Sequence, residues 1–536
     1  MKTSIFGLAL FAASTLLAGP KLAKELEKAD RNKRTNVIIV YKTAPTETQR
    51  KKVTDKGGNQ KRTFTRLKGG AYSVFGRELA ALAADPNVLS IHPDRIVRGN
   101  AVTVVPDYGW LTMLNPPTPS YPQQYTGAGI GIAIIDSGVS AHADFAGRVV
   151  YQESFVPGGT ADTYGHGTHV AGIAAGSGLN STGAAYTYQV RGIAPEANIV
   201  SLRVLDGNGS GSDSDVIAAI ETAIALKSTY NIRVINLSIG RQVFESYTTD
   251  PLCQAVEAAW HAGIVVVVAA GNEGRNNTAG TDGYGLINAP ANDPYVITVG
   301  AMNTVGSQVR TDDKMTSYSS KGPSAGDHII KPDLVAPGNR ILSIRSSGAQ
   351  LDTAVNQILN SSYGTALGTS ADYYELSGTS MAAPMVSGAA ALLLQQNPSY
   401  TPDQVKAKLM LTAYKSFPAT TIAVDTATGT SFTVENNIFT VGAGYLDVYA
   451  ALNSGETPPE FSSAMSPSAV YDEVAGTVTM VNGTSLVWGN SLVWGNSLVW
   501  GNSLVWGNSL VWGNSLVWGN GGQGVDALRV TLQGDK

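Results

Sequence analysis

Between about residue 104 and residue 454 the chain repeatedly alternates short, mainly apolar runs with longer segments that have helical character. The apolar runs lack polar alternation, as expected for strands covered on both faces, and they span residues 129–136, 197–205, 233–240, 264–272 and 295–303. The helix-like segments span residues 165–176, 212–230, 380–396 and 401–413. This order predicts an α/β fold with a doubly wound, mostly parallel sheet flanked by helices, in which ligands bind beyond the carboxyl ends of the strands.

A smaller α+β unit is expected before this sheet, over residues 36–100. Its predicted elements are a strand at 36–42, a helix at 46–57, two strands within 63–76, a helix at 77–86 and a strand at 87–94. The two strands within 63–76 are expected to turn at Gly69-Gly70, because glycine accepts the backbone conformations of tight turns.

The first 19 residues combine a lysine at position 2 with a short apolar run, the pattern of a secretory signal peptide. A buried N-terminal helix is the alternative. No other stretch is long and apolar enough to predict a membrane span. The sequence therefore favours a secreted or cell-surface protein.

Three motifs carry the residue types that nucleophilic catalysis needs, in the order Asp, His, Ser. Asp136 ends the apolar run GIGIAIID (129–136) and lies in the motif IIDSG, His166 lies in YGHGTHVAG, and Ser380 lies in SGTSMAAP. Serine is a weak nucleophile at neutral pH, so a histidine must take its proton, and a carboxylate fixes the tautomer of that histidine. Ser380 also falls at an expected helix start, where backbone N–H groups favour a developing oxyanion.

The three motifs and their order are similar to the signatures of the subtilisin family of serine proteases. The resemblance covers residues 36–454 and implies an endopeptidase with Asp136, His166 and Ser380 as its triad. It further implies that Asn272, in VVAAGNEG, is the side-chain donor to the oxyanion; capping of a turn is the alternative role. Backbone groups expected to line an extended substrate are those of Gly209, Ser210, Gly211, Ser238, Ile239 and Gly240.

The resemblance also gives residues 36–100 a role, as a prosegment that acts as intramolecular chaperone and inhibitor, with its tail in the active site. Self-cleavage is expected near Asn100, and processing anywhere from Arg95 to Val104 stays open. Charge accompanies this division: residues 1–100 carry 19 Lys+Arg against 8 Asp+Glu, whereas the rest of the chain is acidic. An acidic main body argues against nucleic-acid binding, which needs clustered Lys and Arg.

Metal and thiol chemistry are not expected. His169, three residues after His166, lacks the H-E-x-x-H pattern of a zinc site, so a structural role is predicted.

Asp144 resembles a calcium ligand of many relatives, but residues 176–192 do not match their loop. Structural calcium therefore remains open and unassigned, and catalysis is expected to need no cofactor. Cys253 is the single cysteine and is expected to be a small buried residue.

The last part of the chain is expected to comprise a linker or short edge piece at 455–484, six SLVWGN repeats at 485–520 and a tail at 521–536. The period of six fits a β meander with type II′ turns or a hexapeptide β-helix, and a dispensable or disordered duplication is the alternative.

Three functions fit these features. The main one is a secreted, self-processed serine endopeptidase acting on protein or peptide substrates. The second is a surface-attached adhesion protein whose protease domain mainly serves processing, for which the repeats are the support. The third, an inactive peptide-binding module, is disfavoured because no expected catalytic residue is missing.

Overall fold

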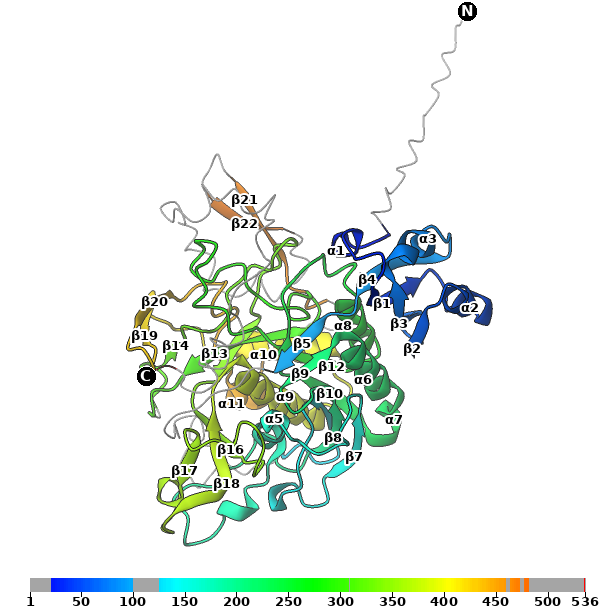
Figure 1. The fold of residues 1–536 in the computed structure, drawn as a ribbon. Coiled ribbons are helices and arrows are strands. Elements are labelled where there is room, and N and C mark those ends of the chain that lie inside the picture. The colour runs from blue at the N-terminus through cyan, green and yellow to red at the C-terminus, as the bar shows by residue number, and fades with distance from the viewer. Residues whose placement is uncertain are drawn as a thin grey trace, which may run out of the picture. The chain divides into compact units, whose positions relative to one another are not determined.

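The structure is a computed structural model, and it describes residues 21–99, 125–307, 309–458, 463–472, 477–481 and 535. The expected signal peptide and the SLVWGN repeats lie outside these residues. The chain divides into two compact units, Met1–Asp94 and Arg95–Lys536 (Figure 1). Each unit has its own sheet.

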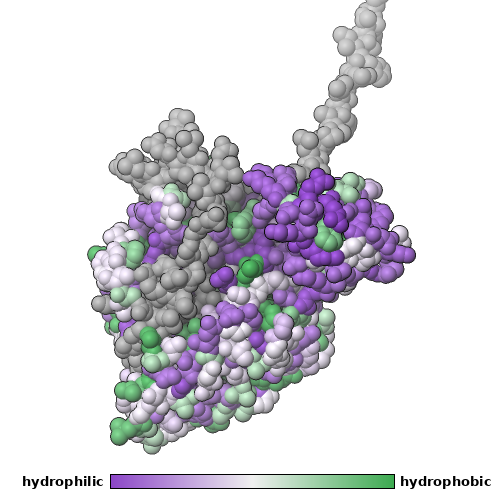
Figure 2. All heavy atoms as spheres, viewed as in Figure 1, coloured by the Kyte–Doolittle hydropathy of each residue, from purple (hydrophilic) through white to green (hydrophobic). Residues whose placement is uncertain are grey.

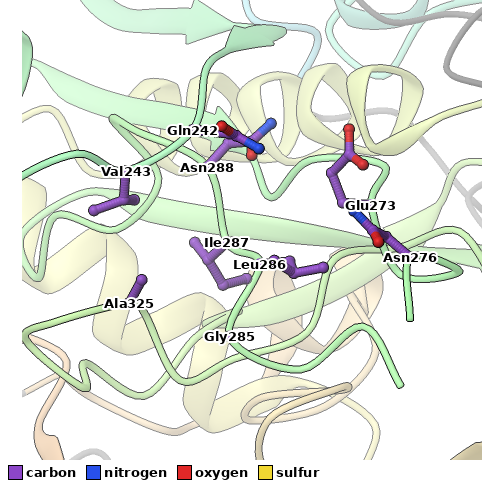
Figure 3. A pocket seen from close by; sticks show the side chains of 9 residues that line it. All are labelled: Gln242, Val243, Glu273, Asn276, Gly285, Leu286, Ile287, Asn288 and Ala325. Atoms are coloured by element: carbon purple, nitrogen blue, oxygen red, sulfur yellow. The ribbon is translucent and has the colours of Figure 1, made fainter. Parts of the chain in front are cut away.

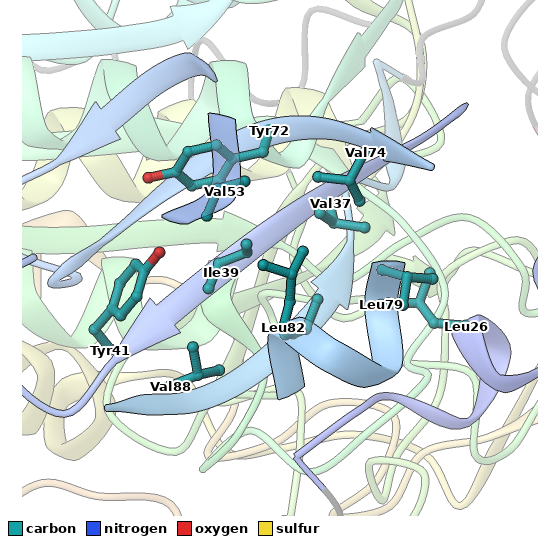
Figure 4. Packing of buried hydrophobic residues seen from close by; sticks show 11 residues of the cluster. Leu26, Val37, Ile39, Tyr41, Val53, Tyr72, Val74, Leu79, Leu82 and Val88 are labelled. Atoms are coloured by element: carbon teal, nitrogen blue, oxygen red, sulfur yellow. The ribbon is translucent and has the colours of Figure 1, made fainter. Parts of the chain in front are cut away.

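The first unit is a four-stranded antiparallel sheet with short helices. Its elements are α1 (Lys24–Glu27), β1 (Arg34–Tyr41), α2 (Glu47–Asp55), β2 (Asn59–Phe64), β3 (Gly69–Phe75), α3 (Leu79–Ala83) and β4 (Val88–Pro93). The strand order is β2-β3-β1-β4. Alternate residues of β1, such as Val37 and Ile39, form a buried core with Val53 of α2 and Leu82 of α3 (Figure 4). This period of two is what lets one face of a strand pack against helices.

Two details of this unit differ from the sequence-based expectation. The turn between β2 and β3 occupies residues 65–68, and Gly69 and Gly70 belong to β3 itself. A Cβ atom on Gly69 would lie 2.5 Å from the carbonyl oxygen of Ile39, so this glycine permits close strand approach. The unit also includes residues before 36, since Leu26 is part of its core.

The second unit contains the predicted parallel sheet, which confirms the fold class. Its strand order is β14-β13-β12-β10-β6-β8-β7, with β15 also paired to β13. These strands are β6 (Gly131–Asp136), β7 (Val149–Ser154), β8 (Asn198–Arg203), β10 (Ile232–Leu237), β12 (Val265–Ala269), β13 (Ile297–Asn303), β14 (Lys314–Met315) and β15 (Leu334–Pro337). Only the β13–β14 pair of this sheet is antiparallel. All residues of β6 and β12 are buried, as their unbroken apolar character predicts.

Helices flank this sheet. They are α5 (His166–Ala175), α6 (Asp213–Ala225), α7 (Lys227–Tyr230), α8 (Pro251–His261), α9 (Thr379–Gln396), α10 (Pro402–Thr412) and α11 (Val448–Asn453). Helix α5 packs against α9, and α6 packs against α8 (Figure 1). The long helix α9 contacts β10, β12 and β13, which places its first residues next to the strand ends. None of the helices in the described part of the chain is long and apolar enough to cross a bilayer.

Smaller sheets surround the central one. A three-stranded sheet has the order β11 (Ile239–Gly240), β5 (Ile96–Gly99), β9 (Ser210–Ser212). Another has the order β16 (Ile341–Ile344), β18 (Thr369–Leu376), β17 (Gln357–Leu359). Two hairpins are β19 (Thr420–Val424) with β20 (Ser431–Glu435), and β21 (Ser468–Asp472) with β22 (Thr477–Val481). The last hairpin lies within residues 455–484, which were expected to be a linker or a short edge piece, and it forms a two-stranded sheet of its own.

Asp535 is joined to the body of the second unit near the β19–β20 hairpin (Figure 1). Its carboxylate is fully buried, accepts a hydrogen bond from the Ser317 amide and pairs with Arg275 at 2.7 Å. Its backbone exchanges two hydrogen bonds with the Asn339 side chain, each 3.0 Å long. Residue 535 is therefore an integral part of this unit.

Candidate active site

Asp136 and His166, the aspartate and histidine of the predicted triad, lie next to each other at the carboxyl end of the central sheet. Asp136 is the last residue of β6, and His166 is the first residue of α5. Nδ1 of His166 lies 2.7 Å from Oδ1 of Asp136, and both side chains are fully buried. Since a carboxylate only accepts hydrogen bonds, the shared proton belongs to Nδ1 of the imidazole. Nε2 of His166 is then left as a proton acceptor in the neutral ring.

A second aspartate, Asp162, holds the segment that carries His166. Its carboxylate accepts hydrogen bonds from the Ser137 hydroxyl, the Gly165 and Thr168 amides, and the Thr168 hydroxyl. Burial raises the pKa of Asp162 above its ordinary value, and the hydrogen bonds from Thr168, Gly165 and Ser137 oppose that rise. Gly165 itself has φ of 99°, a conformation that glycine adopts without strain. No sequence pattern distinguishes Asp162 from an ordinary loop residue.

Ser380 is the second residue of α9, so it lies among the unpaired N–H groups of the first helical turn. Its hydroxyl donates to the Ser238 carbonyl at 2.9 Å, and the Ser238 hydroxyl donates to the Ser380 carbonyl at 2.8 Å. The Ser238 hydroxyl in turn accepts from the Asn236 side chain. This reciprocal pair joins the end of β10 to the start of α9.

Asn272 has a defined orientation next to this helix start. Its Oδ1 accepts hydrogen bonds from the Thr379 amide and the Thr379 hydroxyl, each 3.0 Å long. A backbone N–H can only donate, so the atom that it meets must be the amide oxygen of Asn272. The remaining atom, Nδ2, is a buried donor without a hydrogen-bond partner among the described residues. A buried unpaired N–H costs about 1–3 kcal/mol, and such groups in native structures are often reserved for a ligand.

The strand-binding segments predicted from the sequence meet across β5. Antiparallel pairing joins Val97 to Gly211 and Arg98 to Ser210 on one side. On the other side, Arg98 pairs with Gly240 and Gly99 with Ile239. The chain segment immediately before Asn100 therefore lies as a middle strand, in the place expected for an extended substrate.

Two of the predicted lining residues have other positions. Gly209 precedes β9 with φ of 70° and packs against the Tyr164 ring, which a Cβ atom would meet at 2.4 Å. Ser238 precedes β11 and contacts Ser380 instead of β5. Ser212, which the sequence analysis did not include, pairs with Ile96.

A pocket opens beside Asn272 and β11, with an empty volume of about 390 Å³ that includes its open mouth. Glu273 and Asn276 lie on one side, Val243 and Ala325 on the other, with Leu286 and Ile287 between them (Figure 3). Asn288 also lines it and adjoins Gly240, since a Cβ atom on that glycine would lie 3.1 Å from the Cβ of Asn288. The pocket is therefore apolar at its centre and polar along one edge.

Residues considered for metal binding are occupied by protein contacts. Asp144 accepts hydrogen bonds from the Asn180 amide and the Tyr373 hydroxyl, one on each oxygen. Donors at both oxygens are a poor environment for a calcium ligand, so the residues present do not fit that ion here. His169 lies 2.9 Å from the Ile341 carbonyl, and burial lowers the pKa of His169 to about 3. The described residues contain no group of three or more potential metal ligands.

Comparisons with known proteins point to one family. A sequence profile of the subtilase family matches residues 127–444. Serine protease AprX of Bacillus subtilis is 40% identical over 291 residues, which cover 53% of this chain and 61% of AprX. Subtilisin E of the same species is 34% identical over 365 residues, which cover 67% of this chain and 79% of subtilisin E. The chain thus spans less than two thirds of the length of AprX but more of subtilisin E.

A solved structure supports the same fold. Fervidolysin from Fervidobacterium pennivorans, a keratinolytic enzyme related to subtilisin, matches with a TM-score of 0.60 at 22% identity. The match covers 82% of this chain and 62% of fervidolysin. At this identity the likeness concerns the fold alone. Because the family profile covers more than half of the sequence and the parallel sheet is subtilisin-like, the chain belongs to the subtilase family of serine peptidases.

Proposed function

We propose that this protein is a secreted serine endopeptidase, made as a precursor, that uses Asp136, His166 and Ser380 as its catalytic triad. The observation that carries the proposal is the buried 2.7 Å contact between His166 and Asp136. It fixes the tautomer that leaves Nε2 as a base, which is the state needed to take a proton from a serine. Membership of the subtilase family supports the same reaction.

The reaction follows from the positions of these groups. A protein substrate enters as an extended strand between β9 and β11, held by backbone hydrogen bonds. Ser380 Oγ attacks the scissile carbonyl while His166 Nε2 takes its proton, and the imidazolium is stabilised by Asp136. The developing oxyanion accepts hydrogen bonds from Asn272 Nδ2 and the Ser380 amide. His166 then protonates the leaving amine, and water hydrolyses the acyl-enzyme by the reverse sequence of proton transfers.

The pocket beside Asn272 is suited to the side chain that precedes the scissile bond. Leu286 and Ile287 provide apolar surface, and Glu273 provides a negative charge at one edge. Catalysis in this family needs no cofactor, and no step above uses a metal ion.

The precursor part of the proposal rests on β5. This strand occupies the position expected for substrate, and the Asp136, His166 and Ser380 side chains have no solvent exposure in the full-length chain. A segment that fills the groove before cleavage is suited to an inhibitor, so residues 36–100 act as the prosegment and are cut near Asn100. Residues 1–19 direct export.

The first prediction tests this function. Ser380→Ala should abolish casein hydrolysis and conversion of the precursor, because no other group at the site can form the acyl-enzyme. The measurements are casein hydrolysis, intact mass with N-terminal sequencing, and labelling by a fluorophosphonate. Ser387→Ala, a serine of the same helix that bonds to Asn236, is the matched control and should keep the label. Near-normal turnover by the Ser380→Ala protein would refute the proposed triad.

A further inference from the structure

Arg95, the first residue of the second unit and the residue immediately before β5, is held in that unit through both its side chain and its backbone. Its guanidinium pairs with Glu245 at 2.7 Å, and its carbonyl accepts a hydrogen bond from the Asp213 amide at 2.7 Å. The Arg95 guanidinium also lies over the Phe244 ring, 5.0 Å from the ring centre. Its side chain is only 6% exposed although it belongs to a segment expected to be released.

The site that receives Arg95 includes a fixed group of charged side chains, which are those of Arg241, Asp213 and Asp250. Arg241 is fully paired with two buried carboxylates: it donates to Asp213 at 2.8 and 3.0 Å, and to Asp250 at 2.8 Å. These three side chains together carry one net negative charge, and Glu245 adds another. The Arg241 guanidinium also lies 6.0 Å from the Phe244 ring centre, so this ring adjoins the group of charged side chains. A negative, partly dry site with an aromatic face favours an arginine side chain.

The register of β5 places this site far from the reacting bond. If the chain is cut after Asn100, Arg95 is the sixth residue on the acyl side, and Gly99 and Arg98 pair with β11 between them. Five residues of extended chain span about 17 Å. The Arg95 side chain contacts Phe244 and Glu245, which directly follow the pocket-lining residues Gln242 and Val243 in the chain.

We propose that Phe244 and Glu245 form a subsite that recognises an arginine six residues before the scissile bond, in the prosegment and in protein substrates. The inference rests on the proposed function for its numbering from the cut. The Arg95 contacts themselves do not depend on it. Binding of a remote side chain adds affinity to a strand whose other contacts are backbone hydrogen bonds and carry little sequence information.

The first test uses the full chain with Ser380→Ala, so that the precursor stays uncut. Arg95→Met or Glu245→Gln should each speed amide hydrogen exchange of residues 96–99 about tenfold, the effect of losing one charge-assisted contact on local opening. The double variant should exchange no faster than the single ones, because both remove the same contact. Arg98→Met is the matched control, since Arg98 lies in the same strand and its side chain is exposed. Unchanged exchange in the single variants, or fully additive effects, would overturn the subsite.

The second test uses the mature enzyme and quenched peptides of the sequence RIVRGNAVT. Replacing the first arginine with methionine should lower kcat/KM about tenfold, and replacing the second should change it little. With Glu245→Arg enzyme the preference should invert, so that glutamate at the first position is cut faster than arginine. Equal rates for all first-position peptides would reject recognition of substrates. If no peptide is cut, the proposed function fails while the exchange result still decides the Arg95 contact.

Discussion

At the scale of single residues, Asn272, the proposed oxyanion donor, illustrates how one neighbour fixes the orientation of a side-chain amide. Thr379 donates twice to Oδ1 of Asn272, which leaves Nδ2 as a buried donor with no partner in the described structure. In the proposed mechanism, the cost of that unpaired donor is recovered when a negatively charged oxygen forms next to it. The amide is therefore positioned before substrate arrives, which is the condition for electrostatic catalysis.

Removing this donor should slow the chemical step and leave binding nearly unchanged. We expect Asn272→Ala to lower kcat about a hundred- to a thousandfold, the range known for loss of one such donor in subtilisin itself. Thr379→Val should lower kcat less, by releasing the amide, and Thr379→Ser should restore it because the hydroxyl remains. Steady-state kinetics on one peptide separate kcat from KM. A rise in KM without a fall in kcat would contradict this role for Asn272.

The sequence predicted Asp136, His166 and Ser380 at this site because each of them lies in a recognisable motif. Asp162, Thr379 and Glu245 were not predicted, because their importance comes from partners distant in the chain. Glu245, for example, meets Arg95 only after the chain has folded. Polar loop residues of this kind have no periodic pattern, so contacts alone distinguish them.

At the scale of elements, the carboxyl end of α10 shows a charge used as a cap. The Lys415 ammonium donates to the Met410 carbonyl at 2.5 Å and to the Ala443 carbonyl. Burial lowers the pKa of Lys415 to about 8. A cation near the last carbonyls of a helix interacts favourably with the helix dipole, but here it loses hydration to do so.

This shift predicts a dependence of stability on pH. Between pH 8 and about 10.5 the folded chain holds fewer protons on Lys415 than the unfolded chain does, so this group's contribution to stability rises with pH. Below pH 8 the ammonium is charged in both states and its desolvation cost is present in full. The difference in Tm between the parent and Lys415→Met should therefore move in favour of the parent as pH rises from 8 to 10.5. Both proteins should carry Ser380→Ala to prevent self-digestion, and a difference that stays constant would contradict the assignment.

The strands and helices of the central sheet were predictable because burial on both faces gives long apolar runs, as in β6 and β12. The glycine pair in β3 was assigned wrongly to a turn. Glycine meets two different needs, positive φ and close backbone approach, and the sequence does not distinguish them. Gly69 and Gly70 serve the second.

At the scale of the whole molecule, charge divides between the proposed prosegment and the rest of the chain. Residues 20–100 carry 18 Lys+Arg against 8 Asp+Glu, and residues 101–454 carry 16 against 27. Hydrophilic side chains cover most of the visible surface of the first unit (Figure 2). Opposite charges on two partners raise the rate of association more than they raise affinity.

The isolated proposed prosegment, which has its own hydrophobic core, should therefore inhibit the mature enzyme with an association rate that falls as salt is added. Screening acts over about 8–10 Å at physiological ionic strength, so the fall should be clear between low and moderate salt. Stopped-flow inhibition across a salt series measures the rate. The dissociation rate should change less, since strand pairing of β5 holds the complex. An association rate that is the same at every salt concentration would show that charge plays no part in recognition.

The buried position of Asp535 makes the SLVWGN array an internal insertion between two fixed points, with residues 463–469 bonded to the body on one side and residue 535 on the other. The entropy lost when the ends of a segment are held together grows only with the logarithm of its length. The closure term alone then changes by about 0.1 kcal/mol when one hexapeptide is lost or gained. Chains with one hexapeptide more or fewer therefore pay nearly the same closure entropy to hold Asp535 in its buried position.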